Sequence, residues 1–158
     1  MNATSPMPTA AEIAQQEDAL VFSHFDEETA IALGLALVSE ARTMAAPVVV
    51  DIRTPDRTLF HAALPGSAPD NDHWARRKSN VVLRKHRASM LVGLQFAAAE
   101  KTVGADLGLD PMDYAAHGGS FPIRVAGTGV VGAVTVSGLA SEDDHAMIVR
   151  VLETMLAG

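Results

Sequence analysis

Residues 117–138 read HGGSFPIRVAGTGVVGAVTVSG, and this stretch decides the fold because most of it has the pattern of a β-hairpin. Two runs with many β-branched residues, 120–126 and 130–138, flank a short segment that contains glycine. Connections this short join antiparallel strands, whereas parallel strands need a long crossover. We therefore predict an antiparallel sheet with this hairpin at its C-terminal end.

The glycines at 127–132, GTGVVG, match the dinucleotide-binding pattern G-x-G-x-x-G letter for letter. That fingerprint also needs a helix that opens at the third glycine, because the pyrophosphate binds at the helix N-terminus. Here the strand-like residues AVTV follow instead. We interpret the segment as a hairpin turn, with Gly132 at a packing or bulge position.

The segments upstream predict the rest of the sheet and its helices. A second hairpin is expected from runs 47–52 and 58–64, joined by a turn with proline at its second position, and run 19–25 is expected to form a first strand. Helices are expected over 10–18, 27–44, 73–87, 89–101 and from Ser141 onward. The central strands are too apolar to face water. We therefore predict an α/β (α+β) fold with a five-stranded antiparallel sheet covered by helices.

Length and composition indicate one soluble globular domain. The chain has 158 residues, of which 48% are hydrophobic and 20% charged. It has no cysteine, which excludes disulfides, thiolate metal ligands and a cysteine nucleophile. We expect residues 1–8 to be a disordered lead and 9–158 a single domain. With no secretory signal or membrane-spanning run, the expected location is the cytoplasm, with no membrane partner.

Charge is distributed unevenly along the chain. The net charge of −7 argues against nucleic-acid binding. Eight of the twelve Lys and Arg residues nevertheless lie between Arg53 and Arg87, which gives that segment a formal charge of +5 and the remainder −12. This basic segment fits a solvated helix face docked on an acidic surface, an anion site, or a self-complementary contact between copies.

The basic helix expected at 73–87 places guanidinium groups on one face. Arg77, Asn80, Arg84 and Arg87 follow one another at spacings of three, four and three residues. Guanidinium groups on one face can bind a carboxylate or phosphate, or can form a structural ion-pair network with Asp70, Asp72 or another subunit. Trp74, on a neighbouring face, is expected to anchor the helix in the core.

His117, before Gly118 and Gly119, has three interpretations: a metal or haem ligand, a general base, or a loop residue bonded to a backbone carbonyl. The two glycines would let the backbone approach a bound group closely. No spacing among the six histidines indicates a zinc site, and DNDH at 70–73 lacks the glycine and glutamate of a calcium loop. His145 is expected to be solvated. No catalytic residue is assigned.

Two blocks carry a resemblance to a known family. HGGSFPIRVAGTGVVGAVTVSGL, with the EDDH that follows, resembles the C-terminal motif of the haem-degrading domain family (GlcG/HbpS-like), and DNDHWARRKSN resembles a subgroup of uncharacterised proteins in that superfamily. The likeness covers roughly residues 15–157. It implies a five-stranded sheet with a profilin- or PAS-like layout, assembly through dimers into larger rings, and haem binding or degradation. It gives no axial ligand.

Two main hypotheses follow. In the first, the protein binds haem or another anionic small molecule at a cationic loop. Arg77, Lys78 and Arg84 would neutralise the propionates, and loop 117–119 would approach the ring. The candidate ligand-binding residues are Asp70, Asn71, Trp74, Arg77, Lys78, Arg84, His117, Gly118 and Gly119. The alternative is a non-enzymatic homo-oligomeric scaffold or adaptor without a cofactor, in which the basic segment docks on the acidic remainder of a neighbouring copy. An enzyme acting on a small anionic metabolite at the same loop is a third interpretation.

Overall fold

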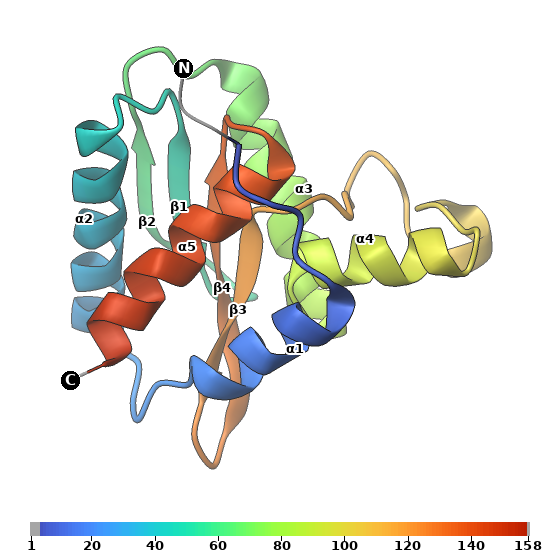
Figure 1. Ribbon diagram of the computed structural model, residues 1–158, viewed down its shortest axis with the longest axis horizontal. Helices are drawn as coiled ribbons and strands as arrows, with labels where there is room; N and C mark the ends of the chain where they lie inside the picture. Colours follow the sequence, from blue (N-terminus) through green and yellow to red (C-terminus); the bar gives the residue numbers. More distant parts are fainter. Residues whose placement is uncertain (1–3, 158) are drawn as a thin grey trace.

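The computed structural model describes residues 4–157 and contains one antiparallel sheet (Figure 1). The sheet has the order β2-β1-β4-β3 and is built from β1 (Val49–Arg53), β2 (Thr58–Ala63), β3 (Ser120–Val125) and β4 (Gly129–Ser137). Both predicted hairpins are confirmed: β1 pairs with β2, and β3 with β4. The central pair, β1 with β4, is also antiparallel.

Helices cover both faces of the sheet, as its apolar strands predict. The helices are α1 (Ala10–Ala19), α2 (Glu27–Thr43), α3 (Pro69–Lys85), α4 (Ser89–Ala98) and α5 (Ser141–Leu156), with a short 3₁₀ helix η1 (Ala105–Leu107). In Figure 1, α5 crosses in front of the strands and α2 stands at their left, in contact with α5, while α3 lies on the opposite side of the sheet. The α/β architecture is confirmed. The profilin- or PAS-like layout stays a prediction.

The predicted strand at 19–25 is wrong, and the sheet has four strands where five were expected. Only Phe22 pairs, through a single parallel bridge to Val125. Its N–H donates to Arg124 O at 2.8 Å and its carbonyl accepts from Ala126 N at 2.9 Å. Residues 20–25 run from the end of α1 at Ala19 to Asp26, which caps α2. The segment therefore connects two helices and pairs with the sheet at Phe22 alone.

The glycine-rich hairpin turn is confirmed. Gly127 and Gly129 have φ values of +76° and +113°, which a turn between strands requires and glycine adopts without strain. Ile123 faces Gly132 while Arg124 faces Val130, so Val131 is the extra residue of a β-bulge. A side chain at Gly132 would lie 2.7 Å from Arg53 O. These glycines therefore serve the turn, the bulge and the β1–β4 contact.

The start of one helix, α3, differs from the sequence prediction. Helix α3 spans Pro69–Lys85, not 73–87, because Asn71 Oδ1 accepts the Ala68 N–H at 2.8 Å and begins the helix earlier. It ends where His86 takes a left-handed conformation with φ of +59°. Helix α5 begins at Ser141, as predicted, although Ala140 supplies no side-chain cap.

The two faces of the sheet have different chemistry. Toward α2 and α5 the strands present apolar side chains that belong to the main hydrophobic core: Val50, Ile52, Phe121, Ile123, Val134 and Val136. Toward α3 the alternate positions include buried polar residues: Asp51, Ser120, Thr135 and Ser137. Helix α3 therefore packs on a face that can hold it through hydrogen bonds.

Candidate functional site

The two glycines after His117 are required by close packing. A side chain at Gly118 would lie 2.5 Å from Ser141 O at the start of α5. Gly119 has φ of +125°, and a side chain there would lie 2.5 Å from Val136 O and collide with Lys78 Nζ. The segment passes between α3, α5 and β4 with no room for a Cβ atom. Close packing alone therefore explains why glycine occupies positions 118 and 119.

Lys78 is a buried cation beneath this segment, with an exposed side-chain fraction of 3%. Its Nζ donates to Val136 O at 2.8 Å, to Gly118 O at 3.0 Å and to Asp144 Oδ2 at 3.3 Å. Three acceptors match the three donors of an ammonium group. All three donors of Lys78 are therefore used in contacts that join α3 to β4, α5 and the segment 117–119.

Asp144 completes a buried ion pair with Lys78. Its carboxylate turns back to accept the N–H groups of Leu139 at 3.0 Å and Gly138 at 3.3 Å. Burial raises the pKa of Asp144 to about 6, although Lys78 and these two N–H groups oppose the shift. Burial likewise lowers the pKa of Lys78, against the attraction of Asp144. The carboxylate of Asp144 therefore joins Lys78 of α3 to the segment that leads into α5.

A polar pocket of about 340 Å³ opens above the Lys78–Asp144 pair. It is lined by Asn71 and Trp74 of α3, by His117, and by residues 137–141 at the start of α5. The structure thus brings four of the predicted site residues to one cavity: Asn71, Trp74, Lys78 and His117. Gly118 and Gly119 lie beneath it.

His117 stands exposed at the rim of this pocket. Its ring meets Trp74 edge to face, with the ring centroids 5.2 Å apart, and Arg77 Cζ lies 4.5 Å from the Trp74 centroid. Partial burial, Lys78 and Arg77 all lower the pKa of His117, which favours its neutral imidazole. Trp74 is only half-buried. The prediction that it anchors the core is wrong, because its ring spans the gap between Arg77 and His117.

A second cavity of about 530 Å³ shares His117 with the first and is also lined by Arg77. It lies between α4 and the segment 99–117, and its walls are mostly apolar, from residues such as Phe96, Val103 and Tyr114. Lys101 adds a second cation to the lining. His117 therefore stands where a polar pocket and an apolar cavity meet.

The outer face of α3 holds the segment 108–114 through side chain–carbonyl contacts. Arg76 donates to Met112 O at 2.8 Å, Arg77 to Pro111 O at 3.0 Å, Asn80 to Asp113 O at 2.8 Å and Arg84 to Gly108 O at 3.1 Å. Arg84 also lies over the Tyr114 ring at 5.4 Å. Of the predicted site residues, Asp70 is exposed in the first turn of α3, and Arg84 lies nearer its other end. Neither lines the two cavities that share His117.

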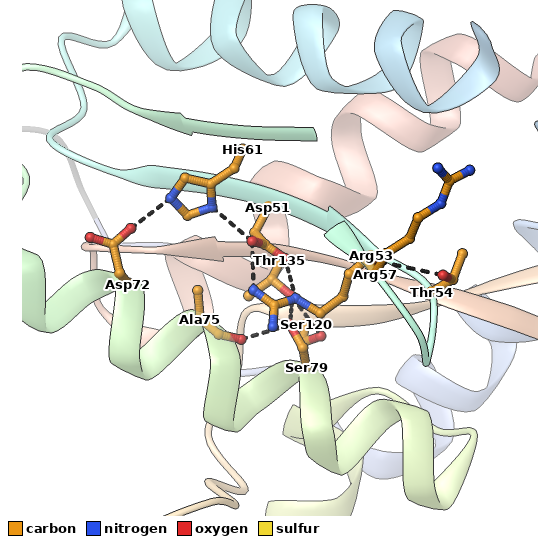
Figure 2. A network of polar contacts seen from close by, with 10 residues as sticks. All are labelled: Asp51, Arg53, Thr54, Arg57, His61, Asp72, Ala75, Ser79, Ser120 and Thr135. Atoms are coloured by element: carbon orange, nitrogen blue, oxygen red, sulfur yellow. Dashed lines mark hydrogen bonds and ion pairs between the residues drawn. The ribbon is translucent and has the colours of Figure 1, made fainter. Parts of the chain in front are cut away.

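A row of polar residues crosses the whole sheet on its α3 face, and sequence reasoning missed it. His61 pairs with Asp51, Asp51 with Thr135, and Thr135 with Ser120, so one residue comes from each strand. Figure 2 shows the row between the sheet and α3. Three of the four residues interrupt an apolar run, as in VVVDI at 48–52 and AVTV at 133–136, and Ser120 precedes one. A polar residue within an apolar strand was the sequence signal that could have indicated this row.

Asp51 is the centre of this row and is fully buried. Arg53 binds it through two bonds, at 2.6 and 2.7 Å, and His61 Nδ1 lies 2.7 Å from its Oδ2. His61 Nε2 in turn lies 2.6 Å from Asp72 Oδ1 of α3. The buried carboxylate is thereby compensated, and β2 is tied to the first turns of α3 (Figure 2).

The other half of the row is a chain of hydroxyl groups. Thr135 Oγ1 lies 2.9 Å from Ser79 Oγ and donates to Ser120 Oγ at 2.8 Å. Ser79 also donates to Ala75 O within α3 at 2.6 Å (Figure 2). These bonds fix α3 along its axis, which places Trp74 and Lys78 opposite loop 117–119.

His145 is buried, so the expectation that it is solvated is wrong. Its Nε2 lies 2.8 Å from Gln16 Oε1 of α1, and its Nδ1 is buried without a hydrogen-bond partner. Burial lowers its pKa to about 4. The second turn of α5 faces α1, and this contact, absent from the local sequence pattern, decides the environment of His145.

This burial predicts acid sensitivity. Because the folded pKa of His145, about 4, lies below the ordinary 6.5, the unfolded chain takes up a proton first as the pH falls. From pH 7 to 5 this residue should lower the free energy of unfolding by roughly 2 kcal/mol. His145→Phe should remove that part of the loss. Urea titrations of both proteins at the two pH values measure it, and equal losses would contradict it.

Comparison with known proteins shows the family of the chain. A family model described as haem degrading protein HbpS-like matches residues 25–153. The chain belongs to the HbpS-like family. A UPF0303 protein of Streptomyces coelicolor is 53% identical over 156 residues, which cover 99% of both chains. A UPF0303 protein of Acidobacterium capsulatum is 48% identical over 140 residues, covering 89% of this chain and 85% of the relative.

Solved structures share the HbpS-like fold. The crystal structure of the Ybr137w protein matches with a TM-score of 0.86 and 30% identity, over 94% of this chain and 88% of that one. HbpS matches with a TM-score of 0.67 and 22% identity, over 84% and 90%. A complex of PduOC with haem matches with 0.68 and 19%, over 84% and 94%, and at that identity it shows the fold alone. None of the helices in residues 4–157 is long and apolar enough to cross a membrane.

Proposed function

We propose that this HbpS-like protein binds haem at the cavity beside His117. The observation that carries the proposal is an imidazole, whose pKa is lowered by partial burial and by the nearby Lys78 and Arg77, at the edge of an apolar cavity of about 530 Å³. The neutral ring is the form that coordinates iron. The match to a haem degrading family and the fold shared with HbpS and the PduOC–haem complex support the same ligand class.

The residues present fit a haem in three respects. His117 would supply an axial nitrogen, and the apolar wall of the cavity, including Phe96 and Val103, would cover the ring. Arg77 and Lys101, which also line this cavity, would neutralise the propionates. Bound iron would add redox and ligand-binding chemistry. The chain's own residues would bind the ring and shield it from water.

The cations placed to neutralise the propionates are not all those expected from the sequence. Lys78 makes three short contacts beneath the pocket and is buried, so it acts on His117 through its charge. Arg84 instead holds the carbonyl of Gly108. Arg77 remains the α3 residue that adjoins both His117 and the apolar cavity, and Lys101 replaces the other two in the proposed set.

Titration with haemin tests the proposal. We expect a Soret band of bound haem at micromolar concentrations, and His117→Ala should weaken binding by at least about tenfold because the axial ligand is lost. His24→Ala is the matched control, because His24 is exposed in the segment between α1 and α2. Arg77→Met should weaken haemin binding while leaving the band position unchanged.

Two outcomes would overturn the haem assignment. The first is no spectral change at micromolar haemin, and the second is equal binding by the wild type and His117→Ala. A thermal-shift series with small carboxylates and phosphates accompanies the titration. Stabilisation by such an anion without a haemin response would assign the polar pocket of about 340 Å³ to a smaller anionic ligand.

The charge asymmetry that motivated the scaffold hypothesis is mostly compensated within the chain. Five of the eight cations in the basic segment have acidic partners in the same chain: Arg53, Arg57, Arg76, Lys78 and Arg87. The exposed pairs among these contribute little free energy, but together the five pairs leave few cations to dock on a neighbour. Non-enzymatic assembly therefore needs a different surface from the basic segment.

A further inference from the structure

Helix α2 carries an exposed stripe that the fold does not use. Every residue of the stripe is exposed: Glu28, Ile31, Leu35, Ser39 and Arg42. Their spacings of three, four, four and three residues keep them on one side of the helix. Ile31 is 40% exposed and Leu35 57%, among the most exposed large apolar side chains of residues 4–157.

The core does not need these side chains. The opposite side of α2 is fully buried against the sheet and α5 through Ala30, Leu33, Leu37 and Ala41. The outer face of such a helix is ordinarily charged and polar, yet here the charged residues stand only at the two ends of the stripe. A helix apolar on both sides indicates a second contact, beyond the one that folds the domain.

The arrangement of the stripe is self-complementary. Glu28 and Arg42 are each seven residues from Leu35, on either side of it. A two-fold axis at Leu35 would lay α2 antiparallel to α2 of a second copy, so that Glu28 faces Arg42 at both ends and Leu35 faces Leu35. The contact would extend for about 21 Å. Among the described residues, neither Glu28 nor Arg42 forms an ion pair.

We propose that the α2 stripe is a homodimer interface, with the two α2 helices antiparallel about Leu35. Ser39 and the exposed Ala32 are small and let the helices approach closely. A groove of about 530 Å³ between α2 and α5 lies alongside, with apolar walls that include Ala36, Val151 and Met155. The charges fit a second copy and not an unrelated partner, because each end of the stripe complements the other.

Charge reversal tests this pairing. Glu28→Arg places arginine opposite arginine at both ends, and Arg42→Glu places glutamate opposite glutamate. Each single variant should raise the dimer dissociation constant by at least about tenfold at low ionic strength. The double variant restores opposite charges and should return the constant to near the wild-type value. Light scattering coupled to gel filtration over a concentration series measures all four proteins.

A cysteine at the proposed axis gives a second readout. The chain has no cysteine, so Leu35→Cys introduces a single thiol. Two copies related by the axis would bring these thiols together, and mild oxidation should convert most of the protein to a covalent dimer. Gln95→Cys, exposed on α4, is the matched control and should stay largely monomeric on a denaturing gel.

Three results would overturn the proposal: a monomeric wild type at every concentration, a dimer indifferent to both charge reversals, or equal crosslinking at positions 35 and 95. The haem proposal has a separate outcome, because the α2 variants should keep the haemin response and His117→Ala should keep the dimer. Circular dichroism of each variant checks that the fold is intact.

Discussion

Lys78→Met is expected to lower the free energy of unfolding by about 3–5 kcal/mol at pH 8, as happens when one partner of a buried ion pair is removed. Methionine keeps most of the apolar stem, but the Asp144 carboxylate and the carbonyls of Gly118 and Val136 lose their donor. Folded domains of this size have only about 5–15 kcal/mol in total. Urea unfolding monitored by circular dichroism measures the loss.

The loss should depend on pH in a defined direction. In the wild type the folded pKa of Asp144, about 6, exceeds its ordinary 3.8. Its protonation therefore adds stability that is fully present below about pH 4 and is lost as the pH rises through 6. Without Lys78 the carboxyl protonates even more readily. The destabilisation should therefore be smaller at pH 5 than at pH 8.

Two controls separate the ion pair from other effects. Lys85→Met removes an exposed lysine of the same helix and should change the free energy of unfolding by less than about 0.5 kcal/mol. The double variant Lys78→Met, Asp144→Asn removes both charges and should recover much of the stability. A pH-independent loss, or no recovery in the double variant, would contradict a role for the charges.

Gly119→Ala is expected to destabilise the protein by more than about 3 kcal/mol or to prevent folding, because the new methyl group would have to displace the backbone. The position combines φ of +125° with a Cβ site 2.5 Å from Val136 O and 2.9 Å from Asp144 Cβ. Displacement of the β4 backbone or of the buried Lys78–Asp144 pair would itself cost free energy of folding. Thermal unfolding and soluble yield measure the effect.

Gly127→Ala is the matched control for backbone strain. Gly127 also has a positive φ, +76°, but no atom lies within 4 Å of its Cβ site. It should cost only about 1 kcal/mol, the typical strain of a left-handed residue. Equal losses at positions 119 and 127 would show that backbone conformation, and not packing, explains the HGG motif.

Local patterns predicted the sheet pairing but not every strand. The hairpins could be inferred because β-branched runs and glycine turns are encoded within a few residues, as at 120–138. Run 19–25, ALVFSHF, contains a single β-branched residue, Val21, and forms only the Phe22 bridge. The difference lies in the helices at both ends of that run, and their exact ends depend on caps such as Asp26.

The candidate site was predicted only in part, because the sequence gives residue types but not tertiary contacts. Trp74, Lys78 and His117 were recognisable by residue type, and the structure does bring them together. Their roles depended on tertiary contacts: Lys78 is buried against Asp144, and Trp74 contacts His117 at the surface. The row from His61 to Ser120 requires the strand register, which no single segment contains.

The polar face of the sheet has a consequence for how α3 can be aligned. An apolar contact tolerates sliding, because one aliphatic group replaces another with little change in energy. Displacement of α3 by one turn, about 5.4 Å, would instead break the contacts from Asp72 to His61, from Ser79 to Thr135 and from Lys78 to Gly118 together. These hydrogen bonds can form together at only one position of α3 along its axis, so they fix the alignment of the helix on the sheet.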